Sequence, residues 1–358
     1  MKKLVATALL MAFLWGVSAQ NGIEKIPLND DNLSYPEGTQ HSFETIDGKN
    51  TLVLNGRAQV KNPRFTNGTI EVEVFANQKR SFAGITFRKQ DETFEEVYIR
   101  MHKSGLPDAL QYNPVFNMES NWQLYPEHQA AVITKNEGWN TLKIVVNGDT
   151  AEIFVNGKSA MVVPDLKTDH EEGNIGLFAL FENRFANLKV SKESEVNLPE
   201  AEESNTIEGL ITEWNLSVPS TFDGKTFPKN VKNVPYMTKG QAETSGLLTV
   251  SKYVTKPSRG KYRRNNEDYV VAGTTINSTE EIVKHFYFDY SDRIMVYLNG
   301  ELLYSGNNGF LFKNPQYEGH LKLETNMVTL PLKKGANELQ CVVIERANGW
   351  GLMGRLTD

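Results

Sequence analysis

Short segments with a two-residue period recur along the chain and limit it to a β-rich fold. Apolar residues alternate with other residues in TIEVEVF, EVYIRM, TLKIVV and AEIFV, which is the period of a strand with one buried face. Asn-Gly pairs, which accept the positive φ angles of tight hairpin turns, occur at 55–56, 67–68, 147–148 and 156–157. We find no convincing long amphipathic helix. The sequence therefore predicts an all-β protein built from sandwiches or barrels.

The first residues have the pattern of a secretory signal peptide. Met1-Lys2-Lys3 is basic, an apolar run extends from Leu4 to Val17, and Val17-Ser18-Ala19 offers small residues for cleavage. The apolar run is too short for a comfortable membrane span. We therefore expect residues 1–19 to be removed, no membrane insertion of the mature chain, and a secreted or periplasmic location in the cell envelope.

A change of composition divides the remainder of the chain. Residues 193–208 are acidic, lack aromatic residues and contain a proline, so they are typical of a linker. Strand-like segments precede and follow them. We expect one β-sandwich over 20–192 and a second over 209–358, both of the jelly-roll type.

Charge and cysteine content exclude some classes of function. The formal net charge of −6 argues against binding to nucleic acid or to an anionic membrane surface, and is easier to reconcile with neutral ligands. Cys341 is the only cysteine, so no internal disulfide can form. It alternates with Leu339 and Val343, which predicts a buried apolar thiol.

The segment GWNTLKIVVNGDTAEIFVNG (138–157) resembles the late hairpin of concanavalin A-like sandwiches, in particular laminin-G-type and 3-keto-disaccharide hydrolase-like modules. Three further segments follow the same order of strands: 65–74, 83–88 and 173–180. The resemblance covers roughly residues 40–192. It implies two packed antiparallel sheets, one of them concave and often used to bind glycans.

The second half resembles a different sugar-associated fold. YSDRIMVYLNGELLYSG (290–306) and LPLKKGANELQCVVIE (330–345) are similar to the galactose-binding-like jelly roll of β-galactosidase sugar-binding domains. Asn299-Gly300 and the Lys334–Leu339 turn stand at the positions of that family's motifs. The catalytic barrel that accompanies such domains in β-galactosidases is absent from this sequence, so we do not expect hydrolysis by this half.

Two glutamates form the first candidate for catalysis. Ile70, Val72 and Val74 alternate on one face, so Glu71 and Glu73 share the other, about 6.6 Å apart along the strand. Glycosidase carboxylate pairs lie at similar separations. Laminarinase-like enzymes of the resembled class carry a longer acidic motif, which this strand matches only in part. The alternative is a pair of solvated glutamates.

A second candidate site lies on a later predicted strand, EVYIRM (96–101). Val97, Ile99 and Met101 form a core face, so Tyr98, Arg100 and His102 point the other way. Residues 103–126 show little alternation and hold four aromatics, which predicts either a functional loop over this face or a plug closing one end of the sandwich. The alternatives are three ordinary outward-facing residues, or a structural pair of Arg100 with Glu71 or Glu73. The predicted ligand-binding residues are Tyr98, Arg100, His102, Asp108, Gln111, Tyr112, Trp122 and Tyr125, and His102 is also a catalytic candidate.

Metal ligands have little support in the sequence. The histidines are scattered without zinc-binding spacing, so we expect no zinc site. Asn29–Asn32 (NDDN) could bind a structural calcium ion, although such clusters more often form turns. No cofactor is expected.

The two resemblances lead to three hypotheses about function. The first is a secreted carbohydrate-binding or accessory protein of glycan utilisation, with an oligo- or polysaccharide as its partner. The second is a secreted glycan-degrading enzyme, a glycoside hydrolase or polysaccharide lyase, with its site on the concave face of the first domain. The third is a structural or protein-binding module of the envelope.

Overall fold

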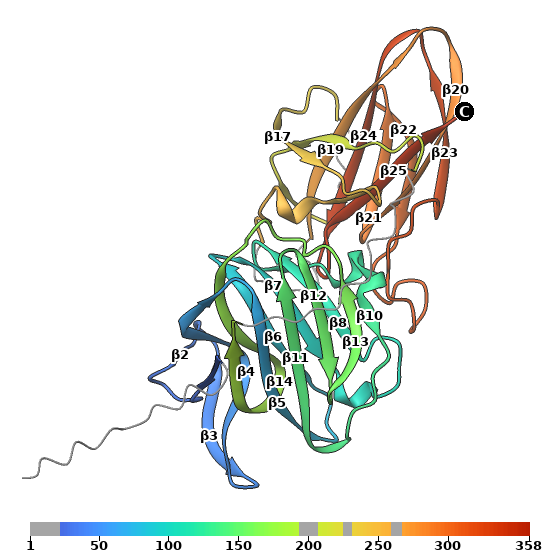
Figure 1. The fold of residues 1–358 in the computed structure, drawn as a ribbon. Helices are drawn as coiled ribbons and strands as arrows, with labels where there is room; N and C mark the ends of the chain where they lie inside the picture. The colour runs from blue at the N-terminus through green and yellow to red at the C-terminus, as the bar shows by residue number, and fades with distance from the viewer. Residues whose placement is uncertain (1–21, 193–206, 225–230, 259–266) are drawn as a thin grey trace, which may run out of the picture.

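The computed structural model describes residues 22–192, 207–224, 231–258 and 267–358. The predicted signal peptide and residues 193–206 of the predicted linker lie outside this part of the chain. The described residues form β-strands and a few short 3₁₀ turns, so the prediction of an all-β protein with two sandwich domains is confirmed. Figure 1 shows the two domains as separate groups of strands. No helix in these residues is long and apolar enough to cross a membrane.

The first domain is one curled 14-stranded sheet. Its strands are β1 (Ile23–Ile26), β2 (Leu33–Ser34), β3 (Gln40–Ile46), β4 (Lys49–Phe65), β5 (Gly68–Asn77), β6 (Phe82–Gln90), β7 (Thr93–Ile99), β8 (Leu110–Phe116), β9 (Glu119–Ser120), β10 (Gln129–Ala130), β11 (Glu137–Asn147), β12 (Thr150–Val155), β13 (Lys158–Val163) and β14 (Gly173–Ser191). Its 3₁₀ turns are η1 (Met101–Lys103), η2 (Trp122–Leu124) and η3 (Pro126–His128).

The long strand β14 joins the two layers of this sandwich. The first half of β14 pairs with β4 and with β6. In the same layer β6 pairs with β7, and β7 pairs with β8. The second half of β14 pairs with β5, which continues through β11 and β12 to β13. Residues 143–146 and 151–155 pair across the Asn147-Gly148 turn, as the sequence predicts.

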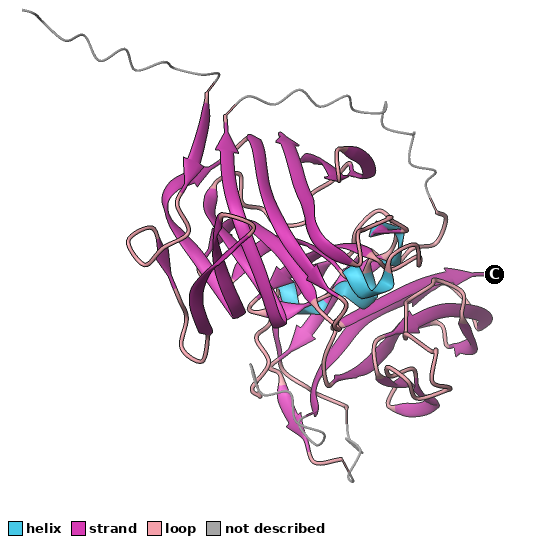
Figure 2. Ribbon diagram, turned by 90° about the horizontal axis from the view of Figure 1, so that it is seen from below, coloured by secondary structure: helices cyan, strands magenta, loops and turns pink. Residues whose placement is uncertain are grey.

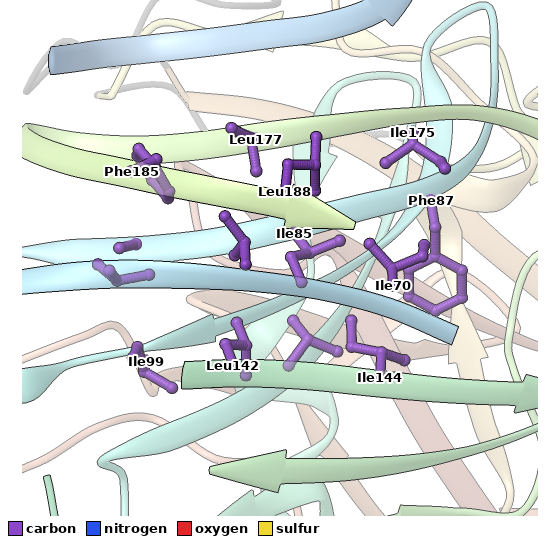
Figure 3. Packing of buried hydrophobic residues seen from close by; sticks show 14 of the residues in the cluster. Ile70, Ile85, Phe87, Ile99, Leu142, Ile144, Ile175, Leu177, Phe185 and Leu188 are labelled. Atoms are coloured by element: carbon purple, nitrogen blue, oxygen red, sulfur yellow. The ribbon is translucent and has the colours of Figure 1, made fainter. Parts of the chain in front are cut away.

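The core lies between these layers and follows the two-residue period. Ile70, Val72 and Val74 on β5 are fully buried, while Glu71 and Glu73 lie on the opposite face. Figure 3 shows Ile70 close to Ile85 and Phe87, which lie on β6 of the other layer. The labelled core residues are Ile70, Ile85, Phe87, Ile99, Leu142, Ile144, Ile175, Leu177, Phe185 and Leu188. Each buried aliphatic or aromatic side chain contributes about 1.5–3 kcal/mol to folding.

The second domain consists of a 7-stranded and a 4-stranded sheet. Its elements are β15 (Glu213–Ser217), β16 (Ser220–Phe222), β17 (Tyr236–Gln241), β18 (Leu247–Thr249), η4 (Val250–Lys252), β19 (Glu267–Ser278), β20 (Ile282–Tyr290), β21 (Arg293–Leu298), β22 (Glu301–Asn307), β23 (Asn326–Leu332), β24 (Gly335–Glu345) and β25 (Gly351–Thr357). Cys341 on β24 is fully buried in this core beside Leu339 and Val343, as predicted, and burial raises the pKa of its thiol.

One segment of the first domain docks the second domain. Residues 117–128, here called the cap segment, cross the outer face of β8 and include β9, η2 and η3. Leu124 of this segment packs in one cluster with Leu247, Leu321 and Met353 of the second domain. Figure 2 shows short helical turns where the two domains meet. The cap segment therefore contributes to a separate hydrophobic cluster at the junction of the two domains.

Candidate functional site

The register of β7, β6, β14 and β4 builds a row of side chains on the outer face of one layer. Tyr98 on β7 lies opposite Gly84 on β6, and Gly84 lies opposite Phe178 on β14. Phe178 in turn lies opposite Arg57 on β4. Because Val97, Leu177 and Ala58 on the same strands face the core, the side chains of Tyr98, Phe178 and Arg57 face away from it. Four strands thus deliver one continuous surface.

Aromatic rings follow one another along this surface, and guanidinium groups lie beside them. The ring centroid of Phe82 lies 5.8 Å from that of Tyr98, and the centroid of Tyr98 lies 6.1 Å from that of Phe178. The Arg57 guanidinium lies 4.5 Å from the centroid of Phe178, and the Arg100 guanidinium lies 5.6 Å from the centroids of both Phe82 and Tyr98. We call this surface the aromatic–arginine face; its members are Arg57, Arg80, Phe82, Tyr98, Arg100, Phe178 and Phe181.

One end of the aromatic–arginine face is open to solvent. Leu180 is 46% exposed, Phe181 is 44% exposed, and Arg80 is exposed beside them. The Arg80 guanidinium lies 5.4 Å from the ring centroid of Phe181 and 5.7 Å from that of the half-buried Phe82. These four residues form the rim of the face, where a ligand has direct access to aromatic surface.

Glycine permits the close approach of strands beneath this face. A Cβ atom on Gly84 would lie 2.4 Å from the carbonyl oxygen of Val97 and 2.8 Å from the Cβ of Tyr98. Both separations are shorter than real side-chain contacts allow, so a side chain at this position would push β6 and β7 apart.

Two ion pairs fix the polar groups of the face. Arg57 Nη1 donates to Glu96 Oε2 at 2.6 Å, and Asn113 Nδ2 donates to Glu96 Oε1 at 3.1 Å. Arg100 Nη1 lies 3.1 Å from Asp108 Oδ2, which also accepts a hydrogen bond from Lys103. Burial by itself would raise the pKa of Asp108, but Lys103 and Arg100 outweigh it and lower the pKa. Asp108 is therefore an ionised acceptor rather than a proton donor.

The cap segment covers the far end of the same layer. Gln111 Nε2 donates to the carbonyl oxygens of Tyr125 at 3.4 Å and His128 at 3.3 Å, and the Asn121 N–H donates to Asn113 Oδ1 at 2.8 Å. Second-domain residues also approach it, since the ring centroids of Trp122 and His320 lie 5.8 Å apart. The open part of the face is consequently its rim.

The structure separates the eight residues predicted to bind ligand. Tyr98, Arg100 and Asp108 come together on the aromatic–arginine face, where they are 5–6% exposed. His102 is exposed at its edge, 5.8 Å from Phe82 between ring centroids, and lines a cavity of about 330 Å³ with Ser81 and Asn136. Arg100 pairs with Asp108, so the alternative of a pair with Glu71 or Glu73 is wrong.

The other four predicted residues lie in the interior or at the domain junction. Tyr112 is fully buried in the core and donates to Glu95 Oε2 at 2.6 Å, and Gln111 is fully buried under the cap segment. Tyr125 is fully buried against the second domain, and Trp122 is half-buried between Phe310 and His320.

The expectation that residues 103–126 form one irregular loop is wrong. They include strand β8, in which all seven residues are buried. One face of β8 contacts the core and the other is covered by the cap segment. A strand covered on both faces has no reason to alternate, which is why its sequence does not look like a half-buried strand.

The catalytic candidates do not converge. Glu71 pairs with Lys189 at 2.7 Å, and Glu73 accepts hydrogen bonds from Lys49 at 2.8 Å and from Asn187. Lys49, Asn187 and Lys189 line a cavity of about 890 Å³, whereas His102 lines the smaller cavity at the other site. Each glutamate is thus neutralised by a lysine and lies apart from the histidine.

Sequence reasoning missed the residues that make the face aromatic. On β14, Ile175, Leu177 and Ala179 face the core, so the intervening Phe178 and Leu180 had to face outward, and this signal was available. The alignment of Phe178 with Tyr98 and Arg57 depends on cross-strand register, which the sequence alone does not specify.

The calcium candidate forms a turn. Asn32 Nδ2 donates to Asn29 Oδ1 at 2.9 Å, and the backbone N–H of Leu33 donates to the carbonyl oxygen of Asn29 at 3.0 Å. These amide contacts account for the polar side chains at both ends of the motif. Within the described ranges, no three His, Cys, Asp or Glu side chains group closely enough to hold a metal ion.

Comparison with protein families identifies the sandwich that carries this face. Residues 34–191 match the 3-keto-alpha-glucoside-1,2-lyase-like domain. This match confirms the resemblance found for the first half of the sequence. The galactose-binding-like resemblance of the second half stays a prediction. A search of curated proteins found no match.

Solved structures similar to this chain cover about half of it. A carbohydrate-binding module, CBM66 from Bacillus subtilis, is 12% identical over 48% of this chain and 96% of its own, with a TM-score of 0.33. A β-glucanase from Bacillus licheniformis is 12% identical over 49% of this chain and 100% of its own, with a TM-score of 0.34. A putative glycosyl hydrolase from Parabacteroides distasonis is 15% identical over 48% and 100%, with a TM-score of 0.35.

Proposed function

We propose that this protein is a secreted or periplasmic carbohydrate-binding protein, accessory to glycan utilisation, that holds its ligand at the rim of the aromatic–arginine face. The observation that carries the proposal is the continuous row of rings and guanidinium groups with an open end at Phe181 and Phe82. Sugar rings offer C–H bonds that pack on aromatic faces and hydroxyls that accept hydrogen bonds from arginine.

Binding is favoured over hydrolysis by the state of the acidic groups. Glycoside hydrolysis needs a carboxyl that gives up a proton to the leaving oxygen and a second carboxylate across the bond. Asp108 at the face has a lowered pKa, and Glu96 is tied to Arg57 and Asn113. Glu71 and Glu73 are bound by lysines in another part of the domain. We therefore place the enzyme hypothesis second.

A glycan array probed with the full chain, followed by product analysis of each hit, tests this proposal. We expect binding without turnover. Phe181→Ala should weaken the affinity for the bound glycan about two- to tenfold, because one stacking contact contributes about 0.5–1.5 kcal/mol. Titration calorimetry measures the change.

Phe312→Ala is the matched control, since Phe312 is a 63% exposed phenylalanine of the second domain. Its substitution should leave the affinity unchanged. Failure of every glycan to bind would reject the proposed function. Loss of binding in Phe312→Ala but not in Phe181→Ala would move the site to the second domain, and cleavage of a hit would favour the enzyme.

A further inference from the structure

Arg100 has hydrogen-bond donors for which the described residues provide no acceptor. The residue is 6% exposed, and only its Nη1 meets a carboxylate, Asp108 at 3.1 Å. Its Nε and Nη2 are buried and have no hydrogen-bond partner within the described part of the chain. Buried polar groups are nearly always partnered, and a charged donor left alone is costly. These two donors therefore favour a partner from outside the described residues.

The two unused donors lie on one edge of the guanidinium group. In the planar guanidinium, the Nε–H and one Nη2–H bond point in parallel from the same side, and Nη1 lies on the other side. This edge matches the two oxygens of a carboxylate, which it binds through two parallel hydrogen bonds. A lysine ammonium at the same place would offer charge without that geometry.

Three carboxylates of the described residues around Arg100 have other partners. Asp108 is shared between Arg100 Nη1 and Lys103, and Glu96 uses one oxygen for Arg57 and the other for Asn113. Glu318 of the second domain lies 3.3 Å from His320 Nε2. The Phe82 ring lies between Arg100 and the exposed Phe181. Its centroid is 5.6 Å from the Arg100 guanidinium and 6.3 Å from the Phe181 ring centroid. Because Nε and Nη2 of Arg100 have almost no solvent-accessible surface, a sugar stacked at the rim reaches them only if side chains beside Arg100 move.

We propose that the Nε–Nη2 edge of Arg100 binds the carboxylate of a uronic acid residue, so that the glycan held by this protein is acidic. The inference rests on the proposed carbohydrate binding at the aromatic–arginine face and names its substrate class. The negative net charge of the protein does not exclude an acidic ligand, because salt screens the repulsion between exposed charges that are more than about 10 Å apart. Local contacts with Arg100 and Arg80 decide the outcome at the rim.

The first experiment uses the unmodified full chain. Its affinity is measured by titration calorimetry for oligomers of galacturonate, glucuronate and mannuronate, each beside its carboxyl-reduced form, and for a sulfated neutral oligosaccharide. For at least one uronate we expect carboxyl reduction to weaken binding tenfold or more. Equal affinity for a uronate and its reduced form, or a sulfated sugar that binds as tightly as any uronate, would overturn the inference.

The second experiment removes the guanidinium edge and keeps the charge. Arg100→Lys should erase most of the preference for the uronate over its reduced form. Arg64→Lys is the control, since Arg64 is an exposed arginine of the same domain paired with Glu172, and it should keep the preference. A full preference in Arg100→Lys would count against the inference.

A spectroscopic readout covers the case in which Arg100→Lys fails to fold. The Nε–H resonance of Arg100 in the unmodified protein should shift on titration with the uronate and stay in place with the reduced sugar. No shift with a bound uronate would overturn the inference. Neutral glycans that bind while no uronate does would also overturn it and leave the proposed function standing, whereas absence of any glycan binding would reject the proposed function itself.

Discussion

Several carboxyl groups of the second domain are buried. Glu345, at the end of β24, is 1% exposed, and its Oε1 accepts a hydrogen bond from the Gly349 N–H at 3.2 Å. Burial raises the pKa of Glu345 well above its ordinary value, and the nearby charge of Asp292 adds to the effect. Burial also raises the pKa of Asp292. The folded protein therefore holds these protons more tightly than the unfolded chain does.

This proton affinity sets the direction of a pH effect on stability. Between the ordinary pKa of 4.5 and the raised pKa, the free energy of unfolding should fall by about 1.4 kcal/mol for each pH unit as the pH rises. Glu345→Gln removes the titrating group, so it should flatten this fall and be more stable than the unmodified protein at pH 8. Urea unfolding at pH 5 and pH 8 measures both values.

Glu301→Gln, a change at an exposed glutamate in the same domain, should leave the pH dependence as it is. If Glu345→Gln destabilises the protein equally at both pH values, the carboxyl is needed as an ionised hydrogen-bond acceptor, and the assigned direction is wrong.

Among the elements, the strands of the aromatic–arginine layer depend on close spacing. β6 contributes Phe82 to the face and lies against β7, with Gly84 directly opposite Tyr98. The missing side chain at Gly84 lets the Tyr98 side chain lie close to the backbone of β6. The geometry of the face therefore depends on a residue that makes no contact with ligand.

Gly84→Ala tests this dependence. The added Cβ would overlap the carbonyl oxygen of Val97 at 2.4 Å, which is backbone and cannot turn away. We expect the free energy of unfolding to fall by about 1–3 kcal/mol, as for other overpacked sites. Chemical denaturation followed by tryptophan fluorescence measures it. An unchanged midpoint would mean that β6 and β7 can separate without loss.

How far each element could be predicted follows from what covers it. β5 and the β11–β12 hairpin expose one face, so their alternation and turn residues made them predictable. β8 is covered on both faces by residues distant in sequence, so its sequence shows no alternation of apolar and polar residues. The candidate site was predictable to the same extent. The alternation of β7 placed Tyr98 and Arg100 on the correct face. The burial of Gln111 and Tyr125 was not predictable, because it depends on the cap segment and the second domain.

At the scale of the whole molecule, polar contacts supplement the apolar junction between the domains. The Tyr125 hydroxyl donates to Glu243 Oε1 at 2.6 Å and lies 2.8 Å from Thr249 Oγ1, and Lys167 lies 2.9 Å from Glu243. Ser251 Oγ donates to Asn121 Oδ1 at 2.8 Å. The tyrosine, serine and asparagine groups are buried, so their loss would not be compensated by water.

Tyr125→Phe should weaken this junction. It removes the hydrogen bond to Glu243 and keeps the ring, so we expect a loss of about 1–3 kcal/mol in the free energy of unfolding. Differential scanning calorimetry and urea unfolding report it. Tyr287→Phe, at a partly exposed tyrosine on β20, is the control and should have little effect. Equal stability of the two variants would show that the hydroxyl of Tyr125 contributes nothing to the junction.

The double role of residues 117–128 has a consequence for how such a chain can be rearranged. The same dozen or so positions close the first sandwich and present Leu124, Gln123 and Tyr125 to the second. The first sandwich, expressed without the second domain, would expose an apolar surface prone to self-association where the second domain now packs. The first sandwich could therefore be fused to another protein only after residues 117–128 had been redesigned.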